Sequence, residues 1–172
     1  DVSHGNYGSP TGTASFAPGK VGQAFSFDGS GWVELPDSPL YEFTTAMTME
    51  AWIRPNDVSN YRQIISKFGS SGNYAYQLGI APGGRLRADY SGNGTTYELL
   101  QSPPGALSVG TWAHVAFTFE SGVVRLYVDG EQVATFRSET GITSLFSTGA
   151  TSPNIGRDPV GLQHFVGLVD EP

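Results

Sequence analysis

Long polar side chains recur at alternate positions in the middle of the chain. Gln77, Arg87 and Asp89 alternate with apolar residues in two consecutive segments, and Tyr97 lies in the segment that follows. A planar guanidinium can bridge two hydroxyl groups, while an amide and a carboxylate supply further hydrogen bonds and a ring at the margin can stack. This set predicts a shallow carbohydrate site, although an ordinary solvated face would have the same residues.

The same alternation predicts which neighbours share this surface, because successive side chains of a strand leave opposite faces. We expect Tyr74, Tyr76 and Leu78 to face the core, so that the polar residues between them face outward. The outward set predicted in this way comprises Gln63, Lys67, Gln77, Arg87, Asp89 and Glu98.

Motifs for catalysis are absent from the sequence. The three histidines, His4, His114 and His164, are too dispersed to suggest a metal triad. Neither a Gly-x-Ser-x-Gly nucleophile motif nor a phosphate-binding loop occurs. Enzymatic activity is therefore not expected.

The stretch 111–137 shows most clearly which elements must position these side chains. Val115, Phe117 and Phe119 alternate with more polar residues, which is typical of a half-buried strand. Asp129-Gly130 then predicts a type I′ turn between two further strands. A three-stranded antiparallel unit of this kind has to bury its apolar face against a second sheet.

Most of the remaining chain consists of short apolar segments separated by glycine-bearing turns. These predicted strands are 14–18, 23–28, 32–35, 47–54, 62–68, 73–80, 85–90, 95–101, 154–157 and 164–169. They predict an all-β, two-sheet antiparallel β-sandwich or jelly roll, with a barrel as the alternative. The predicted core includes Phe25, Phe27, Ile53, Val115, Phe117 and Leu126, and residues 1–13 are expected to form a loop.

Composition limits the possible partners. The 172 residues fit one domain, 1–172, and 23 glycines and 11 prolines suit a protein with many turns. The net charge of −7 argues against nucleic acid and anionic membranes as partners, and no apolar run is long enough to span a bilayer. The absence of cysteine rules out disulfides and thiol chemistry.

Four stretches in order carry a family resemblance. They are Ala17–Ser38 (APGKVGQAFSFDGSGWVELPDS), Met47–Pro55 (MTMEAWIRP), Thr111–Gly130 (TWAHVAFTFESGVVRLYVDG) and Asn154–Glu171 (NIGR…FVGLVDE). The chain resembles the laminin-G-like, concanavalin-A-like jelly-roll modules of secreted bacterial proteins. The resemblance implies two curved antiparallel sheets, a calcium ion near the chain termini, and recruitment to carbohydrate or cell-surface partners.

The resemblance also implies that Asp1, Asn6, Asp28 and Asp170 lie at the same end of the sandwich. Calcium takes six to eight oxygen ligands, so this oxygen-rich set predicts a structural Ca²⁺ that joins the N-terminal loop to the last strand. In the alternative interpretation, Asp28 only caps the turn that follows it and Asp170 is solvated at a strand end.

The sequence departs from the family in two places. Family members usually have one more apolar strand before the stretch matching Asp1 and another after Asp170-Glu171, and the lack of both would leave a sheet edge uncovered. The Glu-x-Asp-x-x-Glu pattern of the related glucanases is also absent.

We therefore interpret the chain as a non-catalytic carbohydrate-binding or adhesion module of a larger exported protein, secreted or at the cell surface. Its expected partners are a carbohydrate or cell-surface glycan and other domains of the parent protein, with no nucleic acid and no membrane insertion. The alternative is a structural spacer or protein–protein interaction domain that binds no sugar.

Overall fold

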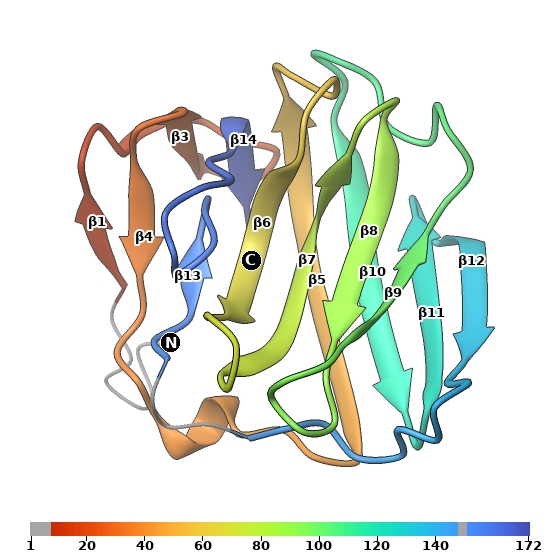
Figure 1. Ribbon diagram of the computed structural model, residues 1–172. Helices are drawn as coiled ribbons and strands as arrows, with labels where there is room; N and C mark the ends of the chain where they lie inside the picture. Colours follow the sequence, from red (N-terminus) through yellow and green to blue (C-terminus); the bar gives the residue numbers. More distant parts are fainter. Residues whose placement is uncertain (1–7, 148–150) are drawn as a thin grey trace.

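The chain folds into two facing antiparallel sheets of seven strands each (Figure 1). The computed structural model describes residues 8–147 and 151–172. Across sheet A, the nearer one in Figure 1, the order is β1 (Ser9–Thr11), β4 (Trp32–Glu34), β13 (Asn154–Ile155), β6 (Arg62–Phe68), β7 (Tyr74–Ala81), β8 (Arg85–Tyr90) and β9 (Glu98–Gln101). Across sheet B it is β12 (Glu131–Arg137), β11 (Val123–Val128), β10 (Ala113–Glu120), β5 (Ala46–Pro55), β14 (Val166–Asp170), β3 (Gln23–Asp28) and β2 (Ser15–Pro18).

This architecture confirms the prediction of an all-β sandwich and excludes a barrel. The only helical element among the described residues is one 3₁₀ turn, η1 (Pro39–Tyr41). No helix in that part of the chain is long and apolar enough to cross a bilayer. Strand β1 lies in a stretch that the sequence predicts to be a loop. A short edge strand needs backbone pairing more than apolar side chains, and Ser9 pairs with Glu34 of β4.

The core lies between the two sheets and matches the prediction closely. Five of the six predicted core residues are at most 3% exposed. These five are Phe27, Ile53, Val115, Phe117 and Leu126. The sixth, Phe25, is half-buried because it packs against Phe16, a residue of the edge strand β2 that is 57% exposed.

The predicted turn between β11 and β12 is confirmed. Asp129 and Gly130 have φ angles of +51° and +84°, the left-handed region that a type I′ turn requires at both positions. The Asp129 carboxylate also accepts a hydrogen bond of 2.8 Å from the backbone N–H of His114. This side chain therefore stabilises the turn and its neighbouring strand.

Two register shifts between β6 and β7 change which side chains face outward. The first lies between Gln63 and Ile65, and it reverses the alternation in β6. The prediction that Lys67 faces outward is therefore wrong. Lys67 is 0% exposed, and its Nζ lies 2.9 Å from Asp37 and 3.0 Å from Glu42.

Glu98 is also placed differently from the prediction. Its carboxylate accepts a 2.6 Å hydrogen bond from the hydroxyl of the core residue Tyr90 and a 2.8 Å bond from the backbone N–H of Thr140. Burial opposes the charge on Glu98, but these hydrogen bonds outweigh it and hold the pKa below its ordinary value. Glu98 thus fastens a loop to sheet A and does not join the polar outer surface.

Replacing Phe117 by alanine tests the core. Phe117 is 0% exposed, and truncation of a fully buried phenylalanine costs about 3–5 kcal/mol. Phe16→Ala removes the same ring from a largely exposed site and should cost less than about 1 kcal/mol. Urea unfolding measures both changes. Equal losses for the two variants would contradict the core described above.

Candidate functional site

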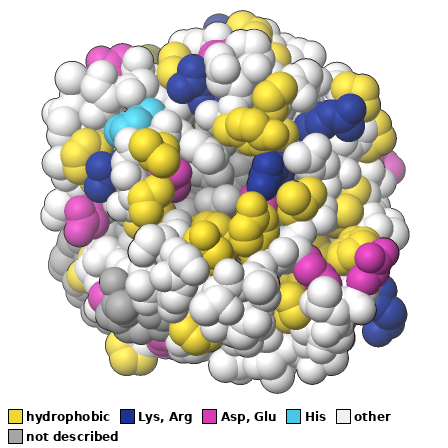
Figure 2. Space-filling model, viewed as in Figure 1, with side chains coloured by type: hydrophobic (Ala, Val, Ile, Leu, Met, Phe, Trp, Pro, Cys, Tyr) yellow, Lys and Arg dark blue, Asp and Glu magenta, His cyan; other side chains and the backbone are white. Residues whose placement is uncertain are grey.

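A hollow of about 320 Å³ opens on the outer face of sheet A. Figure 2 shows this face, where hydrophobic side chains surround the hollow and basic and acidic side chains lie among them. The hollow is lined by Phe68, Tyr74, Gln77, Arg87 and Tyr97 on the sheet side, and by loop residues of 158–163 on the other. Three of the four predicted ligand-binding residues, Gln77, Arg87 and Tyr97, thus line one hollow.

The fourth predicted residue, Asp89, forms the buried base of the site. Asp89 is 1% exposed, and Arg87 donates to its two oxygens from Nε at 2.8 and 3.1 Å and from Nη2 at 2.6 Å. Gln77 Nε2 donates to the same carboxylate at 2.8 Å, while Gln77 Oε1 accepts from Ser66 at 3.1 Å. Asp89 therefore orients Arg87 and Gln77 from below the surface.

The environment keeps Arg87 charged and in a fixed position. Burial disfavours its charge, but the hydrogen bonds and the negative charge of Asp89 outweigh this effect and raise the pKa of Arg87 above its ordinary value. The guanidinium carbon also lies 5.1 Å from the ring centre of Tyr61, within the range of a cation–π contact. The site consequently presents a rigid, positively charged donor.

An aromatic cluster stands beside this donor. Phe68 and Tyr74 stack with ring centres 4.5 Å apart, and Tyr97 meets both rings edge-on at 5.2 and 5.4 Å. Tyr97 is 46% exposed, so part of its ring remains open to solvent. A partly open ring beside fixed polar groups can stack on an apolar face of a ligand while those groups bind its polar edge.

Sequence reasoning missed Phe68 and placed Tyr74 in the core. The second register shift, between Ser66 and Phe68 on β6, inserts an extra residue into β7, so Tyr74 lies on the same side as Gln77 although three positions separate them. No residue pattern in this stretch indicates the shift.

A loop forms the other wall and carries apolar side chains. Val160 is 47% exposed and Leu162 is 77% exposed, and both line the hollow. Asp158 begins this wall, and its carboxylate accepts a 2.6 Å hydrogen bond from the Leu162 N–H. The loop is thus held in shape by its own side chain and presents its apolar tip to a ligand.

The two described members of the predicted calcium set do not lie together. Asp28 pairs with Val166, so Asp170 lies four residues further along β14. At 3.3 Å per residue this separates the two backbone positions by about 13 Å, whereas oxygens bound to one calcium ion lie within about 5 Å of each other. Asp1 and Asn6 lie outside the described residues. Within the described ranges, no three His, Cys, Asp or Glu residues cluster in a way that could hold a metal.

Asp28 and Asp170 also have different surroundings. Asp28 is exposed, and its carboxylate accepts hydrogen bonds from the hydroxyl of Thr13 at 2.5 Å and the N–H of Ser30 at 2.9 Å, which lower its pKa. This geometry is that of a turn cap. Asp170 is 2% exposed and accepts from the N–H groups of Val21 at 2.8 Å and Glu171 at 3.1 Å.

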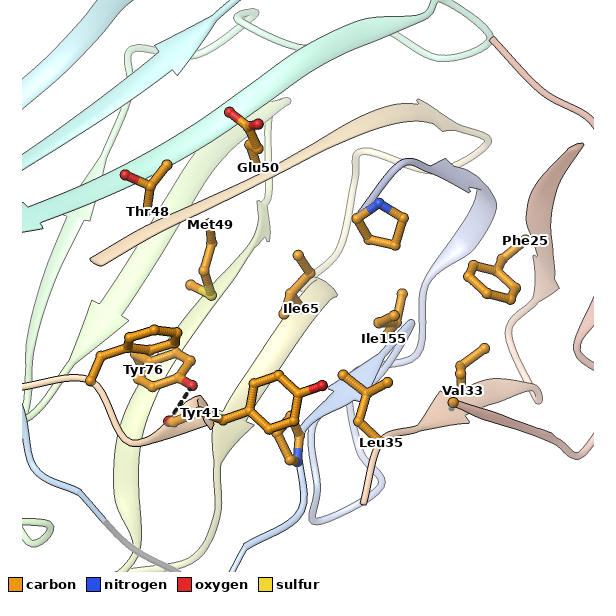
Figure 3. A pocket seen from close by; sticks show the side chains of 14 residues that line it. Phe25, Val33, Leu35, Tyr41, Thr48, Met49, Glu50, Ile65, Tyr76 and Ile155 are labelled. Atoms are coloured by element: carbon orange, nitrogen blue, oxygen red, sulfur yellow. Dashed lines mark hydrogen bonds between the residues drawn. The ribbon is translucent and has the colours of Figure 1, made fainter. Parts of the chain in front are cut away.

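A larger hollow of about 500 Å³ lies between the sheets (Figure 3). Its lining is mainly apolar, and the hydroxyl of Tyr76 donates a 2.9 Å hydrogen bond to the carbonyl of Tyr41. Burial raises the pKa of Tyr76, so this hydroxyl stays neutral. Beside the hollow, residues 46–51 of β5 pair with β10 but with no strand on the other side among the described residues. A hollow with so apolar a lining suits a sugar poorly.

Known proteins share this fold. Domain 4 of AbnA, a GH43 extracellular arabinanase from Geobacillus stearothermophilus in complex with arabinotriose, is similar with a TM-score of 0.71 and 21% identity, over 98% of this chain and 82% of that one. The CBM40 of the Ruminococcus gnavus IT-sialidase bound to alpha2,3 sialyllactose gives a TM-score of 0.67 and 16% identity, over 86% of both chains.

A toxin domain is similar over a smaller share of its length. The binding domain of botulinum neurotoxin DC in complex with SialylT gives a TM-score of 0.67 and 14% identity, over 96% of this chain and 41% of that one. No curated protein sequence matches the chain. The family model described as the concanavalin A-like lectin/glucanases superfamily matches residues 27–172. The chain therefore belongs to the concanavalin A-like lectin/glucanases superfamily.

Proposed function

We propose that this domain is a non-catalytic carbohydrate-binding module of an exported protein, and that it binds a glycan in the hollow on the outer face of sheet A. The observation that carries the proposal is the fixed Arg87, held by buried Asp89 and placed beside the partly exposed ring of Tyr97. A rigid planar donor next to an open ring matches a sugar, which has hydroxyl groups at its edge and C–H groups on its faces.

Two kinds of contact would hold a sugar in this hollow. Donors of Arg87 that do not bind Asp89 can reach sugar hydroxyls, and Tyr97 can cover one face of the sugar ring. The apolar tip of the loop at Leu162 excludes water on the opposite side. A shallow site with one open ring should bind with a Kd of roughly 10–1,000 µM, or about −4 to −7 kcal/mol.

The carboxylates at the hollow are already hydrogen-bonded within the protein, which supports a binding role over a catalytic one. A retaining glycosidase needs two free carboxyl groups about 5–5.5 Å apart, one as acid and one as nucleophile. Asp89 uses both of its oxygens to hold Arg87, and Asp158 holds the loop at Leu162. Solved structures with the same fold that are bound to arabinotriose and to sialyllactose support a glycan as the ligand, and an extracellular relative supports an exported protein.

We also propose that a calcium ion stabilises the domain through Asp170, not Asp28. Asp170 is a carboxylate at 2% exposure whose hydrogen-bond partners among the described residues are uncharged backbone N–H groups, and a buried charge is costly unless an opposite charge compensates it. Asp1 and Asn6 remain the other candidate ligands. Such an ion would supply fixed positive charge and a link between chain segments, with no part in binding the sugar.

Tyr97→Ala should weaken glycan binding about tenfold, equivalent to 1.4 kcal/mol, because it removes the open ring. Phe16→Ala, which removes an exposed ring from sheet B, should leave the affinity unchanged. Titration calorimetry against a panel of neutral and acidic oligosaccharides, including arabinotriose and sialyllactose, measures both. If the wild type binds no member of the panel, the spacer or protein-interaction alternative is favoured.

Arg87→Lys should lower glycan affinity by at least as much as Tyr97→Ala does, since lysine keeps the charge but loses the planar donor. This variant is preferable to Arg87→Ala, which would leave the buried Asp89 without its cation and could cost about 3–5 kcal/mol of stability. Thermal unfolding verifies that the variant is folded before titration. Unchanged affinity in a folded Arg87→Lys protein would remove Arg87 from the site.

A chelator should lower the melting temperature by several degrees if calcium is bound. An ion held only by the native state stabilises it by about 2.7 kcal/mol at a hundredfold excess over Kd. Asp170→Asn should abolish this sensitivity, whereas Asp28→Asn should retain it. The calcium proposal is wrong if the chelator leaves the wild-type melting temperature unchanged, and its ligand assignment is wrong if Asp28→Asn alone abolishes the effect.

A further inference from the structure

A second hollow adjoins the first on the outer face of sheet A. It has a volume of about 300 Å³ and shares Gly69, Ser70 and Val160 with the hollow beside Arg87. Asn154 and Arg157 are among the residues that line it. The two hollows therefore meet at Val160 and form one longer surface depression.

Arg157 is fixed in place by an aromatic ring but has no polar partner among the residues that the structure describes. Its guanidinium carbon lies 3.5 Å from the ring centre of Trp32, which holds the group by a cation–π contact. Within the described part of the chain it forms no hydrogen bond or ion pair, and its Nε is buried without an acceptor. A guanidinium always carries its charge in proteins, so this side chain is a preorganised donor that lacks an acceptor.

Asn154 supplies an unpaired acceptor beside this donor. It is 2% exposed, and its Oδ1 has no hydrogen-bond partner among residues 8–147 and 151–172, while Nδ2 donates a 3.3 Å bond to the carbonyl of Ser152. Buried polar atoms are normally paired, so an unpaired acceptor and an unpaired donor at one hollow indicate a missing polar group.

The chemistry of these groups favours one ligand class. A hydroxyl group both donates and accepts, so a pair of sugar hydroxyls can satisfy Asn154 Oδ1 and Arg157 together. A carboxylate has no proton to give Asn154, and it would meet the negative charge of Glu34, which lines the same hollow. The net charge of −7 further disfavours an anion.

We propose that the Arg157–Asn154 hollow is a second subsite that binds a further neutral sugar ring of the same glycan. The inference rests on the proposed function and narrows its ligand to neutral oligosaccharides of at least two residues. Arg87 and Tyr97 then bind one sugar ring, and Arg157 and Asn154 bind another. The glycan between the two rings passes Val160.

The length of the oligosaccharide tests this proposal. The probes are neutral pairs (arabinose and arabinotriose, xylose and xylotriose, galactose and lactose) together with sialyllactose. In at least one neutral pair the oligosaccharide should bind about tenfold more tightly than the monosaccharide. Arg157→Gln should remove that gain and leave monosaccharide affinity unchanged. Arg137→Gln should keep that gain in affinity. It alters an exposed arginine on β12 whose side chain has no hydrogen bond or ion pair in the described residues.

Trp32 provides a second readout specific to this subsite. In a protein carrying Trp52→Phe and Trp112→Phe, Trp32 is the only tryptophan, so fluorescence excited selectively from tryptophan reports on it alone. Trp32 lies under Arg157, and no tryptophan lines the first hollow. Its emission should change with the oligosaccharide and not with the monosaccharide.

The outcomes separate the two proposals. Equal affinity for the short and long members of every pair, or equal effects of Arg157→Gln and Arg137→Gln, would overturn the second subsite and leave the first site standing. A preference for sialyllactose over lactose that depends on Arg157 would overturn the neutral ligand class. No binding of any probe by the wild type would overturn both proposals.

Discussion

The apolar interior shared by the two sheets determines which side chains remain for function. Because burial of apolar surface is the main stabilising contribution to folding, each strand must direct its apolar residues toward the opposite sheet. Leu86, Ala88 and Tyr90 of β8 are each 0% exposed, so Arg87 and Asp89 must lie on the outer face. The position of the polar site thus follows from the position of the core.

Burial of Asp89 is the second constraint, and it connects the site to the sheet. A carboxylate at 1% exposure must be paired, and it takes its hydrogen bonds from Arg87 on its own strand and from Gln77 on the neighbouring one. Gln77 in turn binds Ser66 on β6. The network spans three adjacent strands, so the orientation of Arg87 depends on their relative register. Such a network favours a rigid site, because moving any member leaves another buried group unpaired.

The sequence predicts the features that depend on regular alternation, and it fails where the alternation is interrupted. The sandwich, the Asp129-Gly130 turn and the outward placement of Gln77, Arg87 and Asp89 follow from period-two patterns and turn chemistry. Lys67 and Tyr74 depart from the predicted alternation because a register shift between β6 and β7 separates each of them from the regular part of its strand. A bulge depends on how two strands fit together, so neither strand contains the information alone. The hollow walls at residues 151–163 are beyond prediction for the same reason, since a loop follows the surface on which it packs.

These irregularities are what make the outer face suitable for a ligand. With strict alternation, Lys67 would stand on this surface and Phe68 would point into the sandwich. The two shifts instead bury Lys67 against Asp37 and Glu42 and bring Phe68 and Tyr74 to the same side as Gln77. The surface therefore carries the stacked rings of Phe68 and Tyr74, which support Tyr97, in place of a flexible lysine. Because bulges are often found next to binding sites, where they redirect side chains, we regard the β6–β7 irregularity as the structural origin of the hollow.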